Sequence, residues 1–267
     1  MDVGAAVGEF HYERLTQLVE WTGALAFEGG PVVDVGGWLG VRDRSWGRRP
    51  HTAADKTPAA NASRTRLLSA APVRAVAGAL LALRPSACPQ FYWLWCPTNF
   101  EGGGGLLLHS QESRLGAQTN AGAHLFLADG SELALATVQL SATYREGTRH
   151  LRTCDVVCEA ADGSRLRLEY RPVNTLFMSG AGYNADEFCH GRAFAAGAAH
   201  RQDVMLAEAV DRNSPLAWHI QEACTVAGRW LDGPLADRAP VTGTGVLEQL
   251  VIGPHAPSGF TRLYDVA

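Results

Sequence analysis

Two segments of the sequence alternate apolar and polar residues on both sides of a tight-turn dipeptide. Residues 123–140 and residues 149–171 each contain two such arms joined by Asp-Gly, which is the pattern of a β-hairpin. In the last arm, Leu166, Leu168 and Tyr170 alternate with charged residues. We therefore expect one side of this strand to be buried and the other to face water, as in an antiparallel sheet.

Further segments have the composition of strands, and the chain is rich in glycine. Its 29 glycines fit a protein of turns and bulges better than one of long helices. Residues 63–83, rich in Ala and Leu, predict a broken helix, whereas residues 192–210 fit either a short helix or a strand pair. The fold class predicted is mainly β and antiparallel, with one or two short helices. The further strands are predicted at residues 24–27, 91–96, 217–227 and 245–252.

The overall composition is that of a globular protein, with 46% hydrophobic and 19% charged residues. The net charge of −4 gives no reason to expect a nucleic acid or an anionic membrane surface as a partner. Lys56 is the only lysine, which excludes a Walker A loop and a Ser-x-x-Lys site. The longest apolar stretch, residues 67–83, contains Arg74 and is too short to span a membrane. With no signal peptide at the N-terminus, we expect a cytoplasmic protein.

The cysteines and histidines do not have the spacing of a metal site. None of the six cysteines forms a Cys-x-x-Cys pair, so we expect reduced and mostly buried thiols. His11, His190, His255 and Glu248 could supply ligands, but their spacing is not diagnostic of a metal. We expect neither a metal nor a cofactor.

The segment with the densest chemistry is residues 36–50. If it forms a strand, Arg42, Arg44 and Trp46 point to one side, while Asp43 and Ser45 point to the other. An acid flanked by arginines is either a structural ion pair or an inward-facing carboxylate with a pKa set by burial. Both interpretations stay open at this point.

This segment also carries a family resemblance. Its Arg-Asp-Arg-Ser-Trp-Gly run resembles the Arg-Asp-His-Ser-Trp-Gly signature of a bacterial family related to the AttH and carotenoid hydratase group. Arg44 replaces the signature histidine, and Val41 replaces an aromatic residue of the hydratases. Other blocks that resemble the family occur in the same order, at residues 10–14, 91–95, 99–100, 147–150, 178–183, 190–191, 245–249 and 253–255.

The resemblance implies a fold and a division of the chain. Proteins of this group have two lipocalin-type β-barrels side by side, and only a short stretch precedes Phe10 here. The expected architecture is therefore a lipocalin-like (calycin-like) antiparallel barrel or sandwich with a partial second barrel. Residues 1–50 would be the remnant of the first barrel, residues 51–90 a linker with a helical segment, and residues 91–267 the lipocalin-like domain.

The resemblance also implies a chemistry. In carotenoid hydratases an aspartate at the position of Asp43 is the acid that protonates an alkene. That step needs a carboxylic acid kept neutral by an apolar site, and aromatic faces that stabilise the cation. Arg42 and His11 would tune the acid; His11 and Glu13 share a strand face and form either a proton relay or an inter-strand polar network. Aromatic candidates, although such residues at strand spacing more often form plain barrel core, are Trp38, Trp46, Tyr92, Trp93 and Trp95. The other candidates for substrate contact are Glu13, Ser45, Met178, Tyr183, His190 and Glu248.

The function expected on this basis is a hydratase-, cyclase- or isomerase-like activity on a hydrophobic small molecule of terpenoid or polyketide type. A non-catalytic carrier of the same kind of ligand is the alternative from another class. A remnant that pairs with a partner subunit, or a homodimer, is also compatible with a missing barrel. The catalytic hypothesis requires the Asp43 carboxyl to face a dry hollow enclosed by strands.

Overall fold

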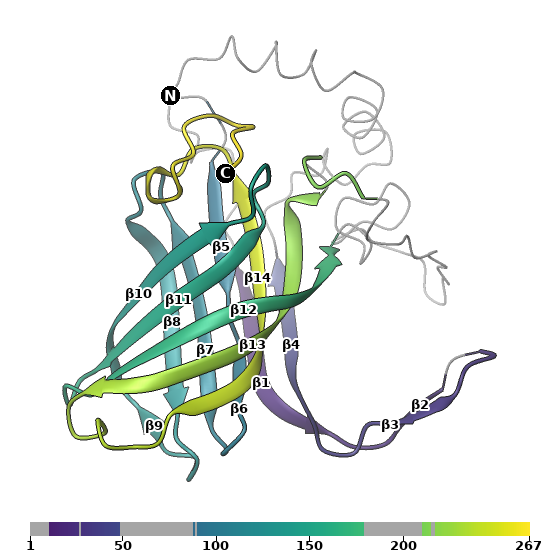
Figure 1. The fold of residues 1–267 in the computed structure, drawn as a ribbon, viewed down its shortest axis with the longest axis vertical. Helices are drawn as coiled ribbons and strands as arrows, with labels where there is room; N and C mark the ends of the chain where they lie inside the picture. Colours follow the sequence, from purple (N-terminus) through teal and green to yellow (C-terminus); the bar gives the residue numbers. More distant parts are fainter. Residues whose placement is uncertain (1–10, 27, 49–87, 89, 179–209, 215–216) are drawn as a thin grey trace.

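Ten antiparallel strands form a single curved sheet that makes up most of the described chain (Figure 1). The structure is a computed structural model that describes residues 11–26, 28–48, 88, 90–178, 210–214 and 217–267. The strands of the sheet are β5 (Phe91–Trp95), β6 (Thr98–Phe100), β7 (Gly105–Glu112), β8 (Gln118–Phe126), β9 (Glu132–Leu133), β10 (Leu135–Tyr144), β11 (Leu151–Ala160), β12 (Arg165–Phe177), β13 (His219–Asp232) and β14 (Val241–Ile252).

The sheet closes on itself as a barrel. Its hydrogen-bonded order is β10-β11-β12-β13-β14-β5-β7-β8-β9, so consecutive strands are neighbours and β14 also pairs with β5. The remaining seam lies between β8 and β10, where Gln118 Nε2 donates to the Val138 carbonyl at 3.4 Å. The expected lipocalin-like antiparallel barrel is confirmed.

The alternation seen in the sequence follows the two faces of this sheet. Leu166, Leu168 and Tyr170 of β12 are completely buried inside the barrel. The two Asp-Gly turns connect the arms as predicted, with Gly130 at φ 83° and Gly163 at φ 86°. Only glycine adopts this left-handed conformation without a steric cost. The hairpin predicted over residues 149–171 is therefore confirmed. Of the one predicted over residues 123–140, the turn joins β8 to the short strand β9, whereas the rest of the second arm, β10, pairs with β11.

Aliphatic, aromatic and thiol side chains form the hydrophobic core inside the barrel. The cysteines of the described chain form no disulfide, and Cys96, Cys154, Cys158 and Cys224 are buried. Burial raises the pKa of Cys154 to about 12. The expected reduced and mostly buried thiols are thus confirmed for these residues, and Cys189 lies outside the described residues.

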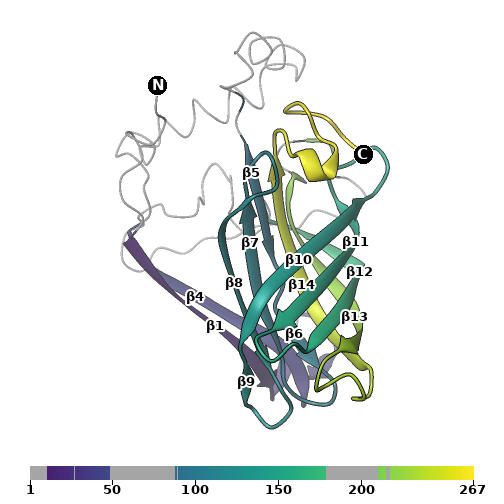
Figure 2. The same ribbon diagram turned by 90° about the vertical axis from the view of Figure 1, so that its left-hand side faces the viewer.

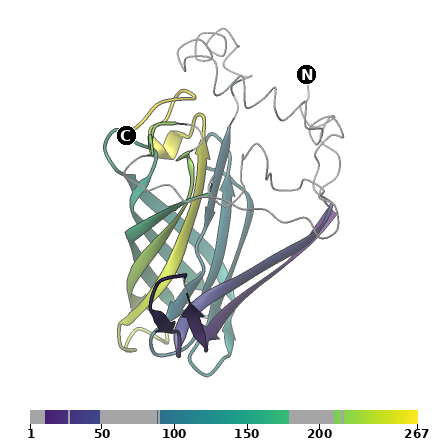
Figure 3. The same ribbon diagram turned by 90° about the vertical axis from the view of Figure 1, so that its right-hand side faces the viewer.

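A two-stranded ribbon, β1 (His11–Trp21) with β4 (Trp38–Arg48), stands away from the barrel (Figures 2 and 3). We call it the N-terminal ribbon; a short hairpin of β2 (Ala24–Ala26) and β3 (Val32–Asp34) connects its strands. One end of the ribbon touches the barrel, where Asn99 Nδ2 donates to the Gly40 carbonyl at 3.0 Å. From there the backbone of the ribbon diverges from that of the barrel wall, and we call the angle between the two backbones the wedge.

The segments predicted as helices or as helix-or-strand, 63–83 and 192–210, lie almost entirely outside the described residues. Within the described part, no helix is long and apolar enough to cross a membrane.

Candidate functional site

Two adjacent rows of cross-strand partners (rungs) on the barrel's outer surface bring polar and aromatic side chains together. The strand register places Glu248 of β14 opposite Gln221 on one side and Trp95 on the other. The next rung aligns His219, Leu250 and Trp93. We define the outer-wall cluster as His219, Gln221, Glu248, Trp93, Trp95 and His109.

The centre of this cluster is a histidine–carboxylate pair. His219 Nε2 lies 3.1 Å from Glu248 Oε1, and Gln221 Nε2 donates to Glu248 Oε2 at 2.7 Å. The two side chains of the pair are only 10% and 17% exposed. Burial acts to raise the pKa of Glu248, but the hydrogen bonds from His219 and Gln221 outweigh it and hold that pKa below its usual value.

His109 of β7, the cross-strand partner of Trp95, places a second imidazole beside Trp93. The His109 ring centre is 5.7 Å from that of Trp93. Gly122, across from His109 on β8, leaves the room that this ring needs, since a Cβ at Gly122 would lie 2.6 Å from His109 Cε1. Burial lowers the pKa of His109, so its neutral form is favoured.

The N-terminal ribbon turns charged side chains toward this wall. Arg14 Nε lies 3.6 Å from Asp43 Oδ1, and Thr16 Oγ1 donates to the same oxygen at 2.9 Å. The Arg14 guanidinium also lies 5.9 Å from the centre of the Trp93 ring, and its charge contributes to the lowered pKa of Glu248. Arg14 therefore pairs with Asp43 on the ribbon and lies beside Trp93 of the barrel wall.

A groove of about 450 Å³ lies at the narrow end of the wedge. This volume is within the usual range for small-molecule sites. It is open to solvent on one side, and the apolar part of its lining comes from both ribbon and barrel. Its lining includes Leu18, Leu39, Phe100, Leu107 and Phe126.

The environment expected for Asp43 is wrong. Its side chain is 32% exposed on the described part of the chain, beside Arg14, and so does not face a dry hollow there. Arg42 does not tune it, because Arg42 points to the opposite face and donates from Nη1 to Gln17 Oε1 at 3.2 Å. Ser45 does share the Asp43 face, opposite Arg14 in the register.

The predicted alternation along residues 42–46 is confirmed, because β4 is a regular strand. Because of this alternation, the tryptophans of β4 lie on the other face of the ribbon from Asp43. Trp38 and Trp46 lie on the ribbon face opposite Asp43 and are 49% and 48% exposed. They cannot form a wall around Asp43, and neither can Glu13, which pairs with Trp46.

The backbone of His11 pairs with Arg48, five positions along the ribbon from the Thr16–Asp43 pair. At strand rise this is about 16 Å. The register therefore does not bring His11 and Asp43 together.

The aromatic segment 91–95 divides between the two sides of the barrel. Trp93 and Trp95 lie on the outer wall with Glu248, whereas Tyr92 points inward, is 2% exposed and stacks on His255 with ring centres 3.8 Å apart. Tyr92 is thus a core residue and does not belong to the outer-wall cluster. Met178 is buried at the end of β12, and Tyr183 and His190 lie outside the described residues.

Sequence reasoning missed Glu222, which has the properties expected of Asp43. It points into the barrel, is completely buried, accepts from Thr175 Oγ1 at 2.7 Å and lies 3.3 Å from Arg145 Nη2. Burial raises its pKa, so its neutral form is favoured. The signal was available, because Glu222 is in phase with the buried Ile220 and Cys224 of the same strand.

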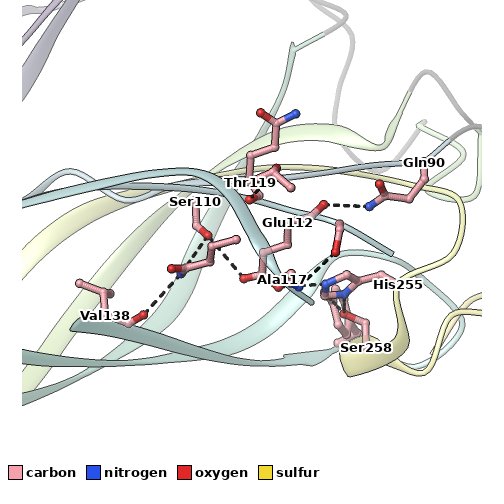
Figure 4. Close-up of polar contacts among 12 residues, drawn as sticks. Gln90, Ser110, Glu112, Ala117, Thr119, Val138, His255 and Ser258 are labelled. Carbon is pink, nitrogen blue, oxygen red and sulfur yellow. Dashed lines mark hydrogen bonds and ion pairs between the residues drawn. The ribbon is translucent and has the colours of Figure 1, made fainter. Parts of the chain in front are cut away.

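A third polar cluster closes one end of the barrel (Figure 4). Ser258 Oγ lies 2.7 Å from His255 Nδ1, and His255 Nε2 lies 3.0 Å from Glu112 Oε2. This order resembles a hydrolytic relay, but the amides of Ser258 and Gly259 donate to carbonyls within their own turn and do not point at a substrate. The cluster therefore fastens the C-terminal segment to the barrel.

Among the residues that the structure describes, no group of three or more His, Cys, Asp or Glu side chains is arranged to hold a metal ion.

Comparison with known families gives one extensive match. The model of a family described as "Family of unknown function (DUF8625)" matches residues 9–261. The chain belongs to this family. A comparison with curated protein sequences finds no match.

Two solved structures are similar in fold. A protein assigned as AttH from Nitrosomonas europaea has 12% identity and a TM-score of 0.40; the alignment covers 90% of this chain and 52% of that chain. Kievitone hydratase from Nectria haematococca has 11% identity and a TM-score of 0.42, with coverages of 92% and 55%. The chain spans about half the length of these structures.

Proposed function

We propose that this DUF8625 protein catalyses proton transfer on a hydrophobic small molecule bound against the outer-wall cluster. The observation that carries the proposal is the His219–Glu248 pair, 3.1 Å apart, on the same wall as Trp93 and Trp95. A shielded histidine–carboxylate pair beside aromatic faces is suited to moving a proton to or from a carbon skeleton.

The two members of the pair have different roles. Glu248 remains ionised, since its hydrogen bonds lower its pKa, and it orients and stabilises the imidazolium of His219. His219 takes up and returns the proton as the general acid and base. Gln221 is a positioning residue that fixes the second carboxylate oxygen.

The surroundings favour an apolar substrate. The tryptophan faces would hold a ring or an isoprenoid chain, and the groove at the base of the wedge would take its apolar end. Terpenoid and polyketide skeletons have this shape and chemistry. The reaction class is hydration, cyclisation or isomerisation, and kievitone hydratase is named for a reaction of this class.

The test distinguishes catalysis from non-catalytic ligand binding. The protein is incubated in D2O with a panel of terpenoid and polyketide compounds, such as geranylgeraniol and a prenylated flavonoid, and deuterium incorporation is followed by mass spectrometry. Binding of the same compounds is followed by quenching of tryptophan fluorescence. We expect incorporation by the wild type, incorporation slower by about 10²-fold or more by Glu248→Gln, and binding by both. Binding without incorporation in the wild type would establish a carrier instead.

A further inference from the structure

A second hollow, of about 310 Å³, lies at one end of the barrel, at the lower end in Figure 1. Its walls come from the β6–β7 turn, the β8–β9 turn and the connection between β13 and β14. We call it the barrel-end pocket. Its volume is near the lower limit for small-molecule sites, and the mouth of a β-barrel is a common place for such sites.

The barrel-end pocket adjoins the groove at the narrow end of the wedge but is lined differently. Phe100, Gly103 and residues 126–128 line both hollows. The rest of the groove comes mainly from the ribbon, whereas the rest of the pocket comes from the barrel, including the core residues Leu125 and Trp230. The described residues of the ribbon do not line the pocket, so the two hollows can take different molecules.

The inner part of the pocket is aromatic. Trp230 and Phe100 line it and belong to the hydrophobic core, with 8% and 7% of their surfaces exposed. Phe126 of β8 adds a third ring to the lining. Aromatic side chains attract another ring through edge-to-face and offset contacts. A ligand whose apolar body carries an aromatic ring therefore fits this part of the pocket.

The rim of the pocket carries a positive charge. Among the described residues that line the pocket, Arg238 is the only charged one. Within the described chain, its guanidinium forms no hydrogen bond or ion pair. The acid that senses this charge is Asp129, whose pKa is lowered chiefly by hydrogen bonds from Ser131 and further by Arg238. Since Asp129 Oδ1 already accepts from the Ser131 amide and hydroxyl at 2.9 and 2.6 Å, the donors of Arg238 remain for a ligand.

We propose that the barrel-end pocket binds an arylalkanoic acid, with the aromatic ring against Trp230 and Phe100 and the carboxylate on Arg238. The planar fork of arginine matches a carboxylate and donates two charge-assisted hydrogen bonds to it. A neutral alcohol of the same shape would bind less tightly, because it lacks the charge that these donors recognise. The inference concerns a second site and does not depend on the proposed activity.

Calorimetric titration of the full-length chain tests the carboxylate contact. The probe is phenylpropionate, and phenylpropanol is the neutral analogue with the same aryl chain. We expect the wild type to bind the acid more tightly than the alcohol, and Arg238→Gln to weaken the binding of the acid alone by about tenfold. Arg229→Gln is the matched control, since Arg229 is an exposed arginine of β13 outside the lining and its loss should change neither affinity.

Three results of this titration would overturn the proposal. They are equal affinity of the wild type and Arg238→Gln for the acid, equal affinity of the wild type for acid and alcohol, and no binding of either compound at up to about 10 mM. Circular dichroism checks the fold of each variant.

Filling the pocket tests where the acid binds. Ala239 is an exposed residue that lines the pocket, so Ala239→Trp should weaken the binding of both compounds by about tenfold or more. Ala236→Trp, at an exposed position of the same connection outside the lining, should bind as the wild type does. Glu248→Gln should also bind as the wild type does, because Glu248 belongs to the outer-wall cluster. Binding that survives Ala239→Trp, or that is lost in Glu248→Gln, would place the acid elsewhere and overturn the proposal.

Discussion

Arg149 Nη1 donates a hydrogen bond to the carbonyl oxygen of Gly253 at 2.8 Å, deep within the protein. The same guanidinium, 1% exposed, also donates to the carbonyls of Asp265 and Arg262 and lies 4.3 Å from the centre of the Phe260 ring. One buried cation thereby attaches the whole C-terminal segment to the barrel. Arginine suits this task because its planar fork presents five donors.

Replacing Arg149 should therefore destabilise the protein strongly. Arg149→Met removes the guanidinium donors from one buried and two partly buried carbonyls, at about 1 kcal/mol each, so we expect a loss of about 3 kcal/mol in the free energy of unfolding. Urea unfolding measures the loss, and Arg152→Met, at an exposed position of β11, is the matched control. Equal stability of the two variants would show that the carbonyls have other partners.

Glu222 should make the fold less stable as the pH rises. Burial raises its pKa, so the folded state binds this proton more tightly than the unfolded state does. The contribution is fully present below the unfolded pKa, near 4.5, and is lost as the pH rises through the folded pKa. The free energy of unfolding of the wild type minus that of Glu222→Gln should therefore be larger at pH 4 than at pH 8. A difference that is constant or grows with pH would contradict this assignment.

Glu248 should have the opposite dependence. Its pKa is lowered by its hydrogen bonds, so its contribution is present above the unfolded pKa and is lost as the pH falls through the folded pKa. The same subtraction for Glu248→Gln should shrink toward low pH, measured by urea unfolding between pH 3 and pH 7. If both glutamates gave the same slope, their assigned environments would be wrong.

Gly122 is expected to be intolerant of even one methyl group. A Cβ there would occupy space held by the His109 ring, so Gly122→Ala should displace that ring and cost about 1–3 kcal/mol. Gly102→Ala is the control, since nothing lies within 4 Å of its added Cβ. The tryptophan emission spectrum should change in Gly122→Ala and stay unchanged in Gly102→Ala, because His109 lies beside Trp93. Unchanged emission in both would mean that His109 is not held by this contact.

The sheet was predictable because the alternation of apolar and polar residues along a single strand indicates which of its side chains are buried. Leu166, Leu168 and Tyr170 alternate with charged residues, and that local pattern is enough to assign both faces. The same rule separates Tyr92 from Trp93, a distinction that a search for aromatic clusters overlooks. Local alternation therefore predicts which residues share a side of one strand.

The candidate site was less predictable because it depends on which strands meet. Glu248 and His219 are separated by the β13–β14 connection and come together only through the register of these strands. The exposure of Asp43 depends on where the ribbon stands relative to the barrel, which no local pattern encodes. Motif spacing could suggest the residue types but not their environment.

The most direct measurement of the proposed function is the rate of deuterium incorporation from D2O into a bound terpenoid or polyketide, compared between wild type, Glu248→Gln and Glu159→Gln. Glu159 is an exposed glutamate of β11, on a strand that contributes nothing to the outer-wall cluster, and serves as the matched control. The account predicts that Glu248→Gln lowers the rate by about 10²-fold or more while Glu159→Gln keeps it. A Glu248→Gln protein that incorporates deuterium as fast as the wild type would contradict it.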